Sequence, residues 1–214
     1  MSKPLVMLGS GGHAAVLADL LSSQQRELFA LISPDKIFPR EIFQGIPVYD
    51  SDKAVIDHFD KDLVKLVNGV GSLPNSNSRR LIFEHFTALG YEFETIVATD
   101  SIVSNYCTLA PGVQIMSGAI VQYGAHIGAN SIINTGAIVD HDCNIGSHNH
   151  LAPGTVLSGH VTSDESVHFG TGSSIIHSIH IAKHVIIGAG CIVRKDMSEN
   201  TVCYPAKMIE RYGK

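Results

Sequence analysis

The residues of this chain that could do chemistry concentrate in the stretch AIVDHDCNIGSHNHLAPGTV, residues 137–156. It sets Asp142 beside His141 and adds His148 and His150 within nine residues of His141. Imidazole and carboxylate groups can transfer protons or bind a metal ion, and they can equally form the polar edge of a repeat. The choice among these three depends on the elements that position the residues.

The composition limits the class of protein. The chain has 214 residues, enough for one large domain or two small ones with a real core. It is 44% hydrophobic and 16% charged, with 20 glycines and no tryptophan, which is typical of a compact, strand-rich protein with many tight turns. A formal net charge of −5 argues against nucleic-acid binding. We interpret the densest basic run, Arg79-Arg80, as part of a solvated helix face.

The sequence carries no sign of export or membrane insertion. The N-terminal residues MSKPLVMLGSGGH contain an apolar run too short for a signal peptide, and no segment approaches a membrane span. The cysteines are widely spaced, so we expect them to be reduced and mostly buried. They are Cys107, Cys143, Cys191 and Cys203. These features predict a cytoplasmic protein.

A six-residue repeat begins at Thr95. Without insertion the chain divides into seventeen hexads, and the third position is apolar in sixteen of them, Ser163 being the exception. No helical period produces this pattern. It predicts a solenoid of short parallel strands with three hexads in each coil and five to six coils. At the usual strand spacing the prism is about 25–30 Å long.

The first ninety residues alternate between strand and helix patterns. We predict strands in KPLVML, ELFALIS and DLVKLVNGVG, and helices in HAAVLADLLSS and SRRLIFEHFTALG. This order predicts a small open parallel sheet. The fold class is therefore an α/β half-Rossmann domain over residues 1–93, followed by a parallel β-helix domain over residues 94–214.

A glycine-rich turn joins the first strand to the first helix. Residues 9–14, GSGGHA, fit the G-x-G-x-x-A form of the Rossmann turn. Glycines let the backbone approach a phosphate, and the helix N-terminus offers it unpaired N–H groups. Asp35, at the end of the second strand, lies where an acid meets a ribose or base. The turn predicts either a nucleotide-linked ligand or a purely structural bend.

A GxGGH half-Rossmann domain joined to a hexapeptide prism resembles the bacterial sugar O/N-acetyltransferases of the NeuD/PglD type. The resemblance covers essentially the whole chain and implies a left-handed β-helix that forms homotrimers. It implies a UDP-linked amino sugar on the N-terminal domain and acetyl-CoA on the prism. The residues implied for the sugar nucleotide are Gly9, Ser10, Gly11, Gly12, His13, Asp35, Gly71 and Ser72.

The resemblance also assigns roles in the opening stretch. An H-[ED] pair inside a prism hexad is the family's catalytic base with its partner, and His141-Asp142 occupies that place. A histidine can accept the proton of an attacking amine or hydroxyl, and the carboxylate orients it. His150 matches a histidine near the acetyl group. Gly159 matches a residue whose backbone N–H reaches the thioester carbonyl.

The coenzyme is expected farther along the prism, chiefly on backbone groups. The remaining implied contacts are Gly170, Thr171, Gly172, Gly188, Ala189, Gly190, Pro205 and Lys207. The chain departs from the family at Cys203, where the ending VCYPAKMI lacks the usual glycine, and at VTSDES, His177 and Ala182. These departures weaken the assignment of the coenzyme tail and leave the coils intact.

The sequence leaves several alternative functions open. Twelve histidines make a zinc-dependent prism enzyme worth weighing, although His177, His180 and His184 are explained as a polar edge and we expect no metal. A non-catalytic scaffold that binds sugar nucleotides needs no His141-Asp142 pair, so the presence of the pair argues against that function.

Within the acetyltransferase class, N-acetylation of a UDP-4-amino-4,6-dideoxy sugar is favoured over O-acetylation of a sialic acid. The sugar epimer is left open.

Overall fold

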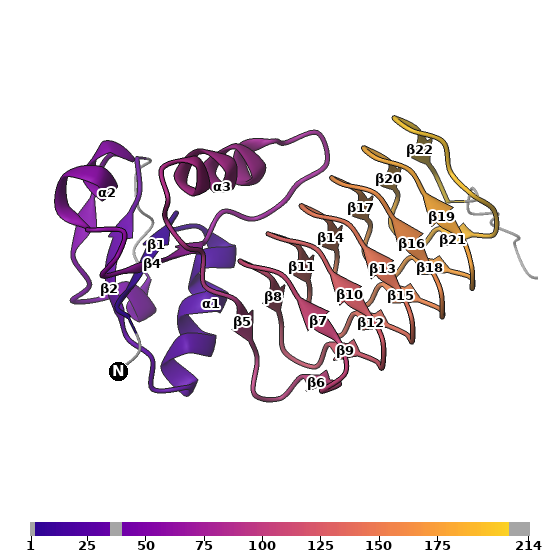
Figure 1. The fold of residues 1–214 in the computed structure, drawn as a ribbon, viewed down its shortest axis with the longest axis horizontal. Coiled ribbons are helices and arrows are strands. Elements are labelled where there is room, and N and C mark those ends of the chain that lie inside the picture. Colours follow the sequence, from indigo (N-terminus) through magenta and orange to yellow (C-terminus); the bar gives the residue numbers. More distant parts are fainter. Residues whose placement is uncertain (1–2, 35–39, 206–214) are drawn as a thin grey trace, which may run out of the picture.

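The structure is a computed structural model that describes residues 3–34 and 40–205. Asp35 and Lys207, two of the expected ligand contacts, lie outside the described residues. The chain forms an α/β part at one end and a long stack of coils at the other (Figure 1). Both parts of the predicted fold class are confirmed.

The α/β part is a four-stranded parallel sheet in the order β3-β2-β1-β4. Its strands are β1 (Leu5–Leu8), β2 (Leu28–Ile32), β3 (Val48–Tyr49) and β4 (Lys65–Asn68). Its helices are α1 (Gly12–Ser23), η1 (Glu41–Phe43), α2 (Lys53–His58) and α3 (Ser78–Ala88). The three predicted strands and two predicted helices are present. β3 and α2 were not predicted, because two and six residues are too short to show a period.

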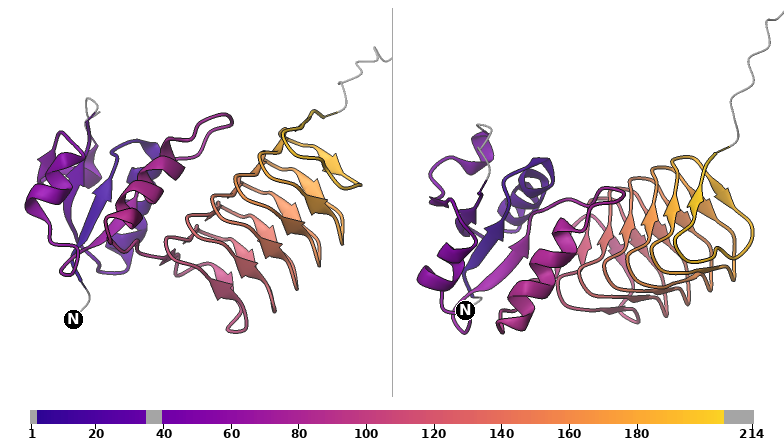
Figure 2. Two further views of the ribbon diagram at one scale, coloured as in Figure 1. Left: turned by 45° about the horizontal axis from the view of Figure 1, so that its top comes forward. Right: turned by 90° about the horizontal axis from the view of Figure 1, so that it is seen from above.

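Both faces of this sheet are covered. Leu5 and Met7 pack with α1, whereas Val6 and Leu8 pack with α2 and α3 on the other face. The α1 side also contains Ile96, Ala98, Met116 and Ile132 from the first coils. The sheet and the prism therefore share one apolar cluster, and α3 lies alongside the first coils (Figure 2).

The repeat region is a prism of three parallel sheets. The seven-stranded sheet contains β5 (Ile96–Val97), β8 (Gln114–Ile115), β11 (Ile132–Ile133), β14 (His150–Leu151), β17 (His168–Phe169), β20 (Ile186–Ile187) and β22 (Val202–Cys203). The six-stranded sheet contains β6 (Ile102–Val103), β9 (Ile120–Val121), β12 (Ile138–Val139), β15 (Val156–Leu157), β18 (Ser174–Ile175) and β21 (Ile192–Val193). The five-stranded sheet contains β7 (Thr108–Leu109), β10 (His126–Ile127), β13 (Asn144–Ile145), β16 (Thr162–Ser163) and β19 (His180–Ile181).

Strand register follows the repeat. Ile138 pairs with Ile120 below and Val156 above, so neighbours in adjacent coils are 18 residues apart. The third residue of each hexad points inward, and Val139 and Leu157 are fully buried. Ser163, the polar exception, is also buried and accepts a 2.7 Å hydrogen bond from Asn149 Nδ2. The exception therefore keeps the inward direction and satisfies its hydroxyl.

The 18-residue register gives the prism three edges, which we name by one residue each. The His141 edge joins the six-stranded to the five-stranded sheet and carries Tyr123, His141, Gly159 and His177. The His148 edge joins the five-stranded to the seven-stranded sheet and carries Asn130, His148, Ser166 and His184. The Gly172 edge joins the seven-stranded to the six-stranded sheet and carries Gly136, Gly154, Gly172 and Gly190.

Because of coil stacking, two glycines should differ sharply in how much their substitution destabilises the protein. A Cβ added at Gly146 would lie 2.5 Å from the backbone oxygen of Asp164 in the next coil, whereas one at Gly136 meets nothing within 4 Å. We expect Gly146→Ala to lower the free energy of unfolding by about 1–3 kcal/mol. Gly136 has φ +65°, which asparagine tolerates, so Gly136→Asn should change it by less than about 0.5 kcal/mol. Urea unfolding measures both, and equal losses would contradict the close approach.

Candidate functional site

His141 and Asp142 stand at the turn between β12 and β13. Asp142 has φ +57°, the left-handed conformation that asparagine and aspartate tolerate best among non-glycine residues. Its N–H donates to the Tyr123 carbonyl of the coil below, at 3.0 Å. The turn directs both side chains outward, and they are 51% and 43% exposed. The pair is therefore open to a substrate or to a second chain.

The two side chains form a hydrogen-bonded pair whose groups are suited to proton transfer. His141 Nδ1 lies 2.9 Å from Asp142 Oδ2. A carboxylate only accepts hydrogen bonds, so Nδ1 donates and Nε2 of the neutral ring is left as an acceptor. The hydrogen bond to Asp142 raises the pKa of His141, with a smaller contribution from the charge of Asp140, against partial desolvation. The arrangement favours an imidazole that accepts a proton at Nε2.

The next coil closes one side of this unit. Gly159 lies one coil above His141, and a Cβ there would come within 2.5 Å of Cε1 and Nε2 of the imidazole. Only glycine lets the ring and this backbone approach so closely. His160 follows, with its ring 5.1 Å from the His141 ring and nearly perpendicular to it. Its Nε2 lies 3.8 Å from Asp142 Oδ2.

The glycine-rich turn borders a cavity of about 620 Å³ in the α/β part. Gly9 has φ +100°, so the bend itself requires glycine. A Cβ at Gly11 would meet no atom within 4 Å, so no intramolecular packing explains the glycine there. The side chain of Ser10 bonds that of Ser33 at 2.7 Å. The predicted residues Gly9, Ser10, Gly11, Gly12, His13 and Gly71 all line this cavity.

His13 is held by the prism. Its Nε2 lies 2.7 Å from Gln114 Oε1 in β8, at the start of the second coil. Burial lowers the pKa of His13 to about 4, helped by the charge of Arg79 and opposed by the hydrogen bond to Gln114. The ring is therefore neutral at physiological pH and positions the start of α1 against the coils.

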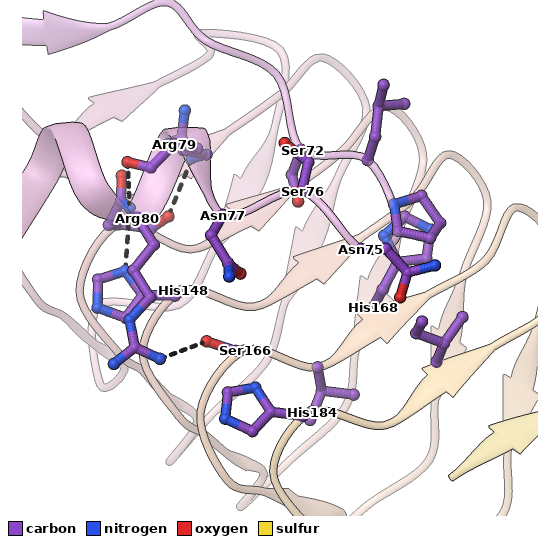
Figure 3. Close-up of a pocket in the computed structure, with 15 residues that line it drawn as sticks. Ser72, Asn75, Ser76, Asn77, Arg79, Arg80, His148, Ser166, His168 and His184 are labelled. Atoms are coloured by element: carbon purple, nitrogen blue, oxygen red, sulfur yellow. Dashed lines mark hydrogen bonds between the residues drawn. The ribbon is translucent and has the colours of Figure 1, made fainter. Parts of the chain in front are cut away.

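A second cavity, of about 270 Å³, lies on the other side of the loop that leads into α3 (Figure 3). Leu73 lines both cavities, and Ser72, a predicted contact, lines the second. From the prism this cavity receives His148, Ser166, His168 and His184 (Figure 3). The loop thus separates a glycine-lined chamber from a histidine-lined one.

His150 is buried beside the second cavity. Its Nε2 lies 3.1 Å from Asn134 Nδ2, and its ring lies 5.1 Å from that of His168. Burial lowers the pKa of His150 to about 3, and the charges of His168, His13 and Arg79 lower it further. Nδ1 of each ring, His150 and His168, is buried without a hydrogen-bond partner among the described residues. Unpartnered buried nitrogens of this kind are suited to a polar ligand.

Our sequence interpretation of Arg79-Arg80 was wrong for Arg79. Arg79 is 5% exposed, and its guanidinium donates to three backbone carbonyls, those of Asn68 (2.8 Å), Val70 (2.8 Å) and Asn130 (3.2 Å). Burial lowers the pKa of Arg79 to about 9. No sequence signal distinguished it from Arg80, which pairs with Glu84 at 2.6 Å. The partners of Arg79 come from two separate segments, residues 68–70 at the end of β4 and Asn130 in the coils.

The predicted site residues fall on different edges. His141, Asp142 and Gly159 share the His141 edge, whereas His150 begins β14 on the far side of the five-stranded sheet. The other predicted coenzyme contacts within the described residues lie mostly on the Gly172 edge, and Pro205 is exposed after β22. Those on the edge are Gly170, Thr171, Gly172, Gly188, Ala189 and Gly190. Gly170 and Gly188 have a packing reason as well, because a Cβ on either would come within 3 Å of backbone in the next coil. One chain alone does not bring the predicted set together.

The histidines weighed for a zinc enzyme are also dispersed. His177 lies on the His141 edge, His180 in β19 and His184 on the His148 edge. Over residues 3–34 and 40–205, the group of three possible metal-ligating side chains is instead His141, Asp142 and His160. In the same ranges, no helix is both long and apolar enough to cross a membrane.

Comparison with known proteins places this geometry in a class. Residues 4–86 match the family described as the PglD N-terminal domain. The acetyltransferase domain of PglB from Neisseria gonorrhoeae superposes with a TM-score of 0.84 at 28% identity, over 97% of this chain and 100% of that one. Among curated proteins, none matches the chain.

A second relative extends the comparison. PerB from Caulobacter crescentus, solved with CoA and GDP-perosamine, superposes with a TM-score of 0.83 at 28% identity over 93% of this chain and 92% of that one. A histidine-to-asparagine variant of that organism's perosamine N-acetyltransferase matches equally well. WeeI from Acinetobacter baumannii, at 20% identity, shares the fold. The chain thus carries a PglD-type N-terminal domain and resembles this class of sugar acetyltransferases over its whole length.

The buried histidines predict acid sensitivity. His13 and His150 have folded pKa values of about 4 and about 3, below the unfolded value of about 6.5. Below pH 6.5 the unfolded chain takes up protons on these histidines that the folded protein does not. The free energy of unfolding is therefore highest above pH 6.5 and declines as pH falls toward 4, by at most about 1.4 kcal/mol per pH unit for each histidine. We expect His150→Gln to make that decline shallower, measured by urea unfolding from pH 7.5 to 4. His177→Gln, at an exposed position, is the control, and an equal effect would contradict the assignment.

Proposed function

We propose that the protein is an acetyl-CoA-dependent acetyltransferase that N-acetylates a nucleotide-linked amino sugar. The observation that carries the proposal is the exposed His141-Asp142 pair, hydrogen-bonded at 2.9 Å and capped by Gly159. The glycine-lined cavity beside the PglD-type turn supports a nucleotide acceptor. The relatives solved with CoA or acetyl-CoA support the donor. The perosamine enzyme, which was solved with CoA, is an N-acetyltransferase, and this favours nitrogen over oxygen as the acceptor atom.

The chemistry follows from the tautomer of His141. The neutral amine nitrogen attacks the thioester carbonyl carbon and forms a tetrahedral intermediate. The nitrogen loses a proton to His141 Nε2, the carbon–sulfur bond breaks, and the departing CoA thiolate takes that proton from the imidazolium and leaves as the thiol. Asp142 holds Nδ1–H and stabilises the imidazolium. We assign to Gly159, whose backbone lies close to the His141 ring, the role of donating its N–H to the developing oxyanion.

The acceptor's nucleotide is assigned to the cavity at residues 9–13, with its phosphates at the start of α1. The sugar then extends past Ser72 toward His150 and His168. A UDP-linked 4-amino-4,6-dideoxy sugar remains our first choice, and a GDP-linked amino sugar is the second, because PerB was solved with GDP-perosamine. A panel of both, followed by mass spectrometry of the product, chooses between them.

A homotrimer explains why the predicted residues are dispersed. His141 and Gly159 lie on one edge, and His150 with the nucleotide cavity lies across the five-stranded sheet. Two prisms side by side would set the His141 edge of one against the His150 region of the next, with the coenzyme between them. The described coenzyme residues on the Gly172 edge would then be contacted farther along the cleft. Three such sites close a ring.

Replacement of the base tests the mechanism. His141→Asn should lower turnover by about 10²- to 10⁴-fold without changing the affinity for acetyl-CoA, since the imidazole contacts the acceptor. Product formation is followed by mass spectrometry, and coenzyme binding by calorimetry. His126→Asn, at another exposed prism histidine, is the matched control. Near-normal turnover of His141→Asn would show that another group is the base.

Mixed trimers test whether the site forms between chains. Gly11→Val should leave folding intact, because Gly11 has φ −74° and open space around it, yet it should block the nucleotide and raise the acceptor KM. Gly11→Val and His141→Asn chains, each nearly inactive alone, should regain about one quarter of wild-type activity when co-expressed. Intersubunit sites then contain both intact halves. Activity no greater than the sum of the separate variants would place the whole site in one chain.

A further inference from the structure

We propose that His141, Asp142 and His160 form a binding site for Zn²⁺, and that the ion inhibits the enzyme by occupying its base. The donor atoms of the three side chains all lie within 4.8 Å of one another. Two are imidazole nitrogens and one is a carboxylate oxygen. This donor set suits zinc and related transition metals, whereas Mg²⁺ and Ca²⁺ prefer oxygen alone.

The fold fixes the backbone of this site. His160 follows Asp142 by 18 residues and therefore stands directly above it in the next coil. Both residues are in the left-handed conformation, with φ +57° and +59°. The His160 N–H donates to the His141 carbonyl at 3.0 Å. Backbone positions are thus set by coil stacking, and only side-chain rotations remain for metal binding.

The side chains are close to a coordinating arrangement. His141 Nδ1 to Asp142 Oδ2 is 2.9 Å, and His160 Nε2 to the same oxygen is 3.8 Å. Ligand bonds of about 2.0–2.2 Å put two ligand atoms of a tetrahedral zinc ion about 3.4 Å apart. Small rotations of the two rings bring the distances to this value. All three side chains are exposed on the single chain. In the proposed trimer they line the cleft that the substrates enter, so an ion can enter there as well and water can fill the fourth position.

Metal binding would disable His141 through its tautomer. Zinc takes Nδ1, the nitrogen that now donates to Asp142, and the single proton of the neutral ring moves by way of solvent from Nδ1 to Nε2. The neutral, zinc-bound ring then carries its proton on Nε2, which can no longer accept one from the attacking amine. Asp142 is drawn to the ion as well. This inhibitory consequence rests on the proposed function, whereas the binding itself does not.

Two variants on the same edge separate the site from general histidine binding. His160→Asn removes one ligand, and asparagine tolerates the left-handed conformation at φ +59°. His177→Asn removes an exposed histidine of the same edge, one coil beyond Gly159. Neither residue has a place in the proposed mechanism, so both variants should acetylate within a few-fold of wild type.

Binding is measured first, by calorimetry with ZnCl₂ and substrate-free protein. We expect one zinc ion per chain for wild type and His177→Asn, and a dissociation constant raised at least about 10-fold for His160→Asn, a loss typical even of outer-shell partners. MgCl₂ should give no binding at this site. No zinc binding by wild type, or equal binding by His160→Asn, would overturn the site.

Inhibition is measured second, by mass spectrometry of the acetylated product, because the free CoA thiol itself binds zinc. Zinc at the concentration that saturates the site should stop wild type and His177→Asn and spare His160→Asn, with EDTA restoring activity. Zinc that binds without inhibiting would overturn the inhibitory role. A wild-type protein that acetylates no amino sugar would instead refute the proposed function and leave the binding result standing.

Discussion

The fold depends on one set of buried hydrogen bonds between the sheet and the prism, which we call the polar seam and which centres on Arg79. Arg79 donates to the carbonyls of Asn68, Val70 and Asn130, and so ties the end of β4 to a corner of the coils. Gln114 adds a bond from its Nε2 to the Asn68 carbonyl. No ion pair of Arg79 with a carboxylate is found among the described residues, so carbonyl dipoles replace a counterion. Removing the Arg79 side chain would leave these carbonyl groups buried without this hydrogen-bond donor, which would lower the free energy of unfolding.

The seam determines where ligands can bind. Asn68 and Val70 end the strand that precedes the loop at Gly71 and Ser72, and this loop separates the two cavities. Because Arg79 ties that strand end to the coils, it helps to set the separation between the glycine-rich turn and the buried histidines of the prism. Ligands of open α/β sheets bind outside the carboxyl ends of the strands. Here that end faces the prism, so the acceptor that we propose to bind at the sheet would be directed toward the coils.

Burial divides the histidines of the prism into two kinds. His150 and His168 lie inside, where desolvation lowers their pKa values and keeps them neutral. His141 lies outside, where the hydrogen bond to Asp142 raises its pKa. The same side chain is therefore suited to a neutral polar contact in one place and, in the proposed mechanism, to accepting a proton in another. Hexad position alone does not set this difference, because His126 and His180 also occupy second positions and are exposed. His168 instead lines a cavity together with the loop that precedes α3.

The sequence by itself determined the prism, because a six-residue period with an apolar third position has only one inward face, and it determined the sheet, because strands and helices alternate. It also marked His141-Asp142 and the turn at Gly11 by local motif. Only the tertiary structure decided that Arg79 is buried while Arg80 is not, since both share one helix and one composition. It alone placed His141 and His150 on opposite sides of a sheet and brought His160 to Asp142. Such relations depend on which coils stack and on how the sheet docks, and these are long-range contacts that no local pattern records.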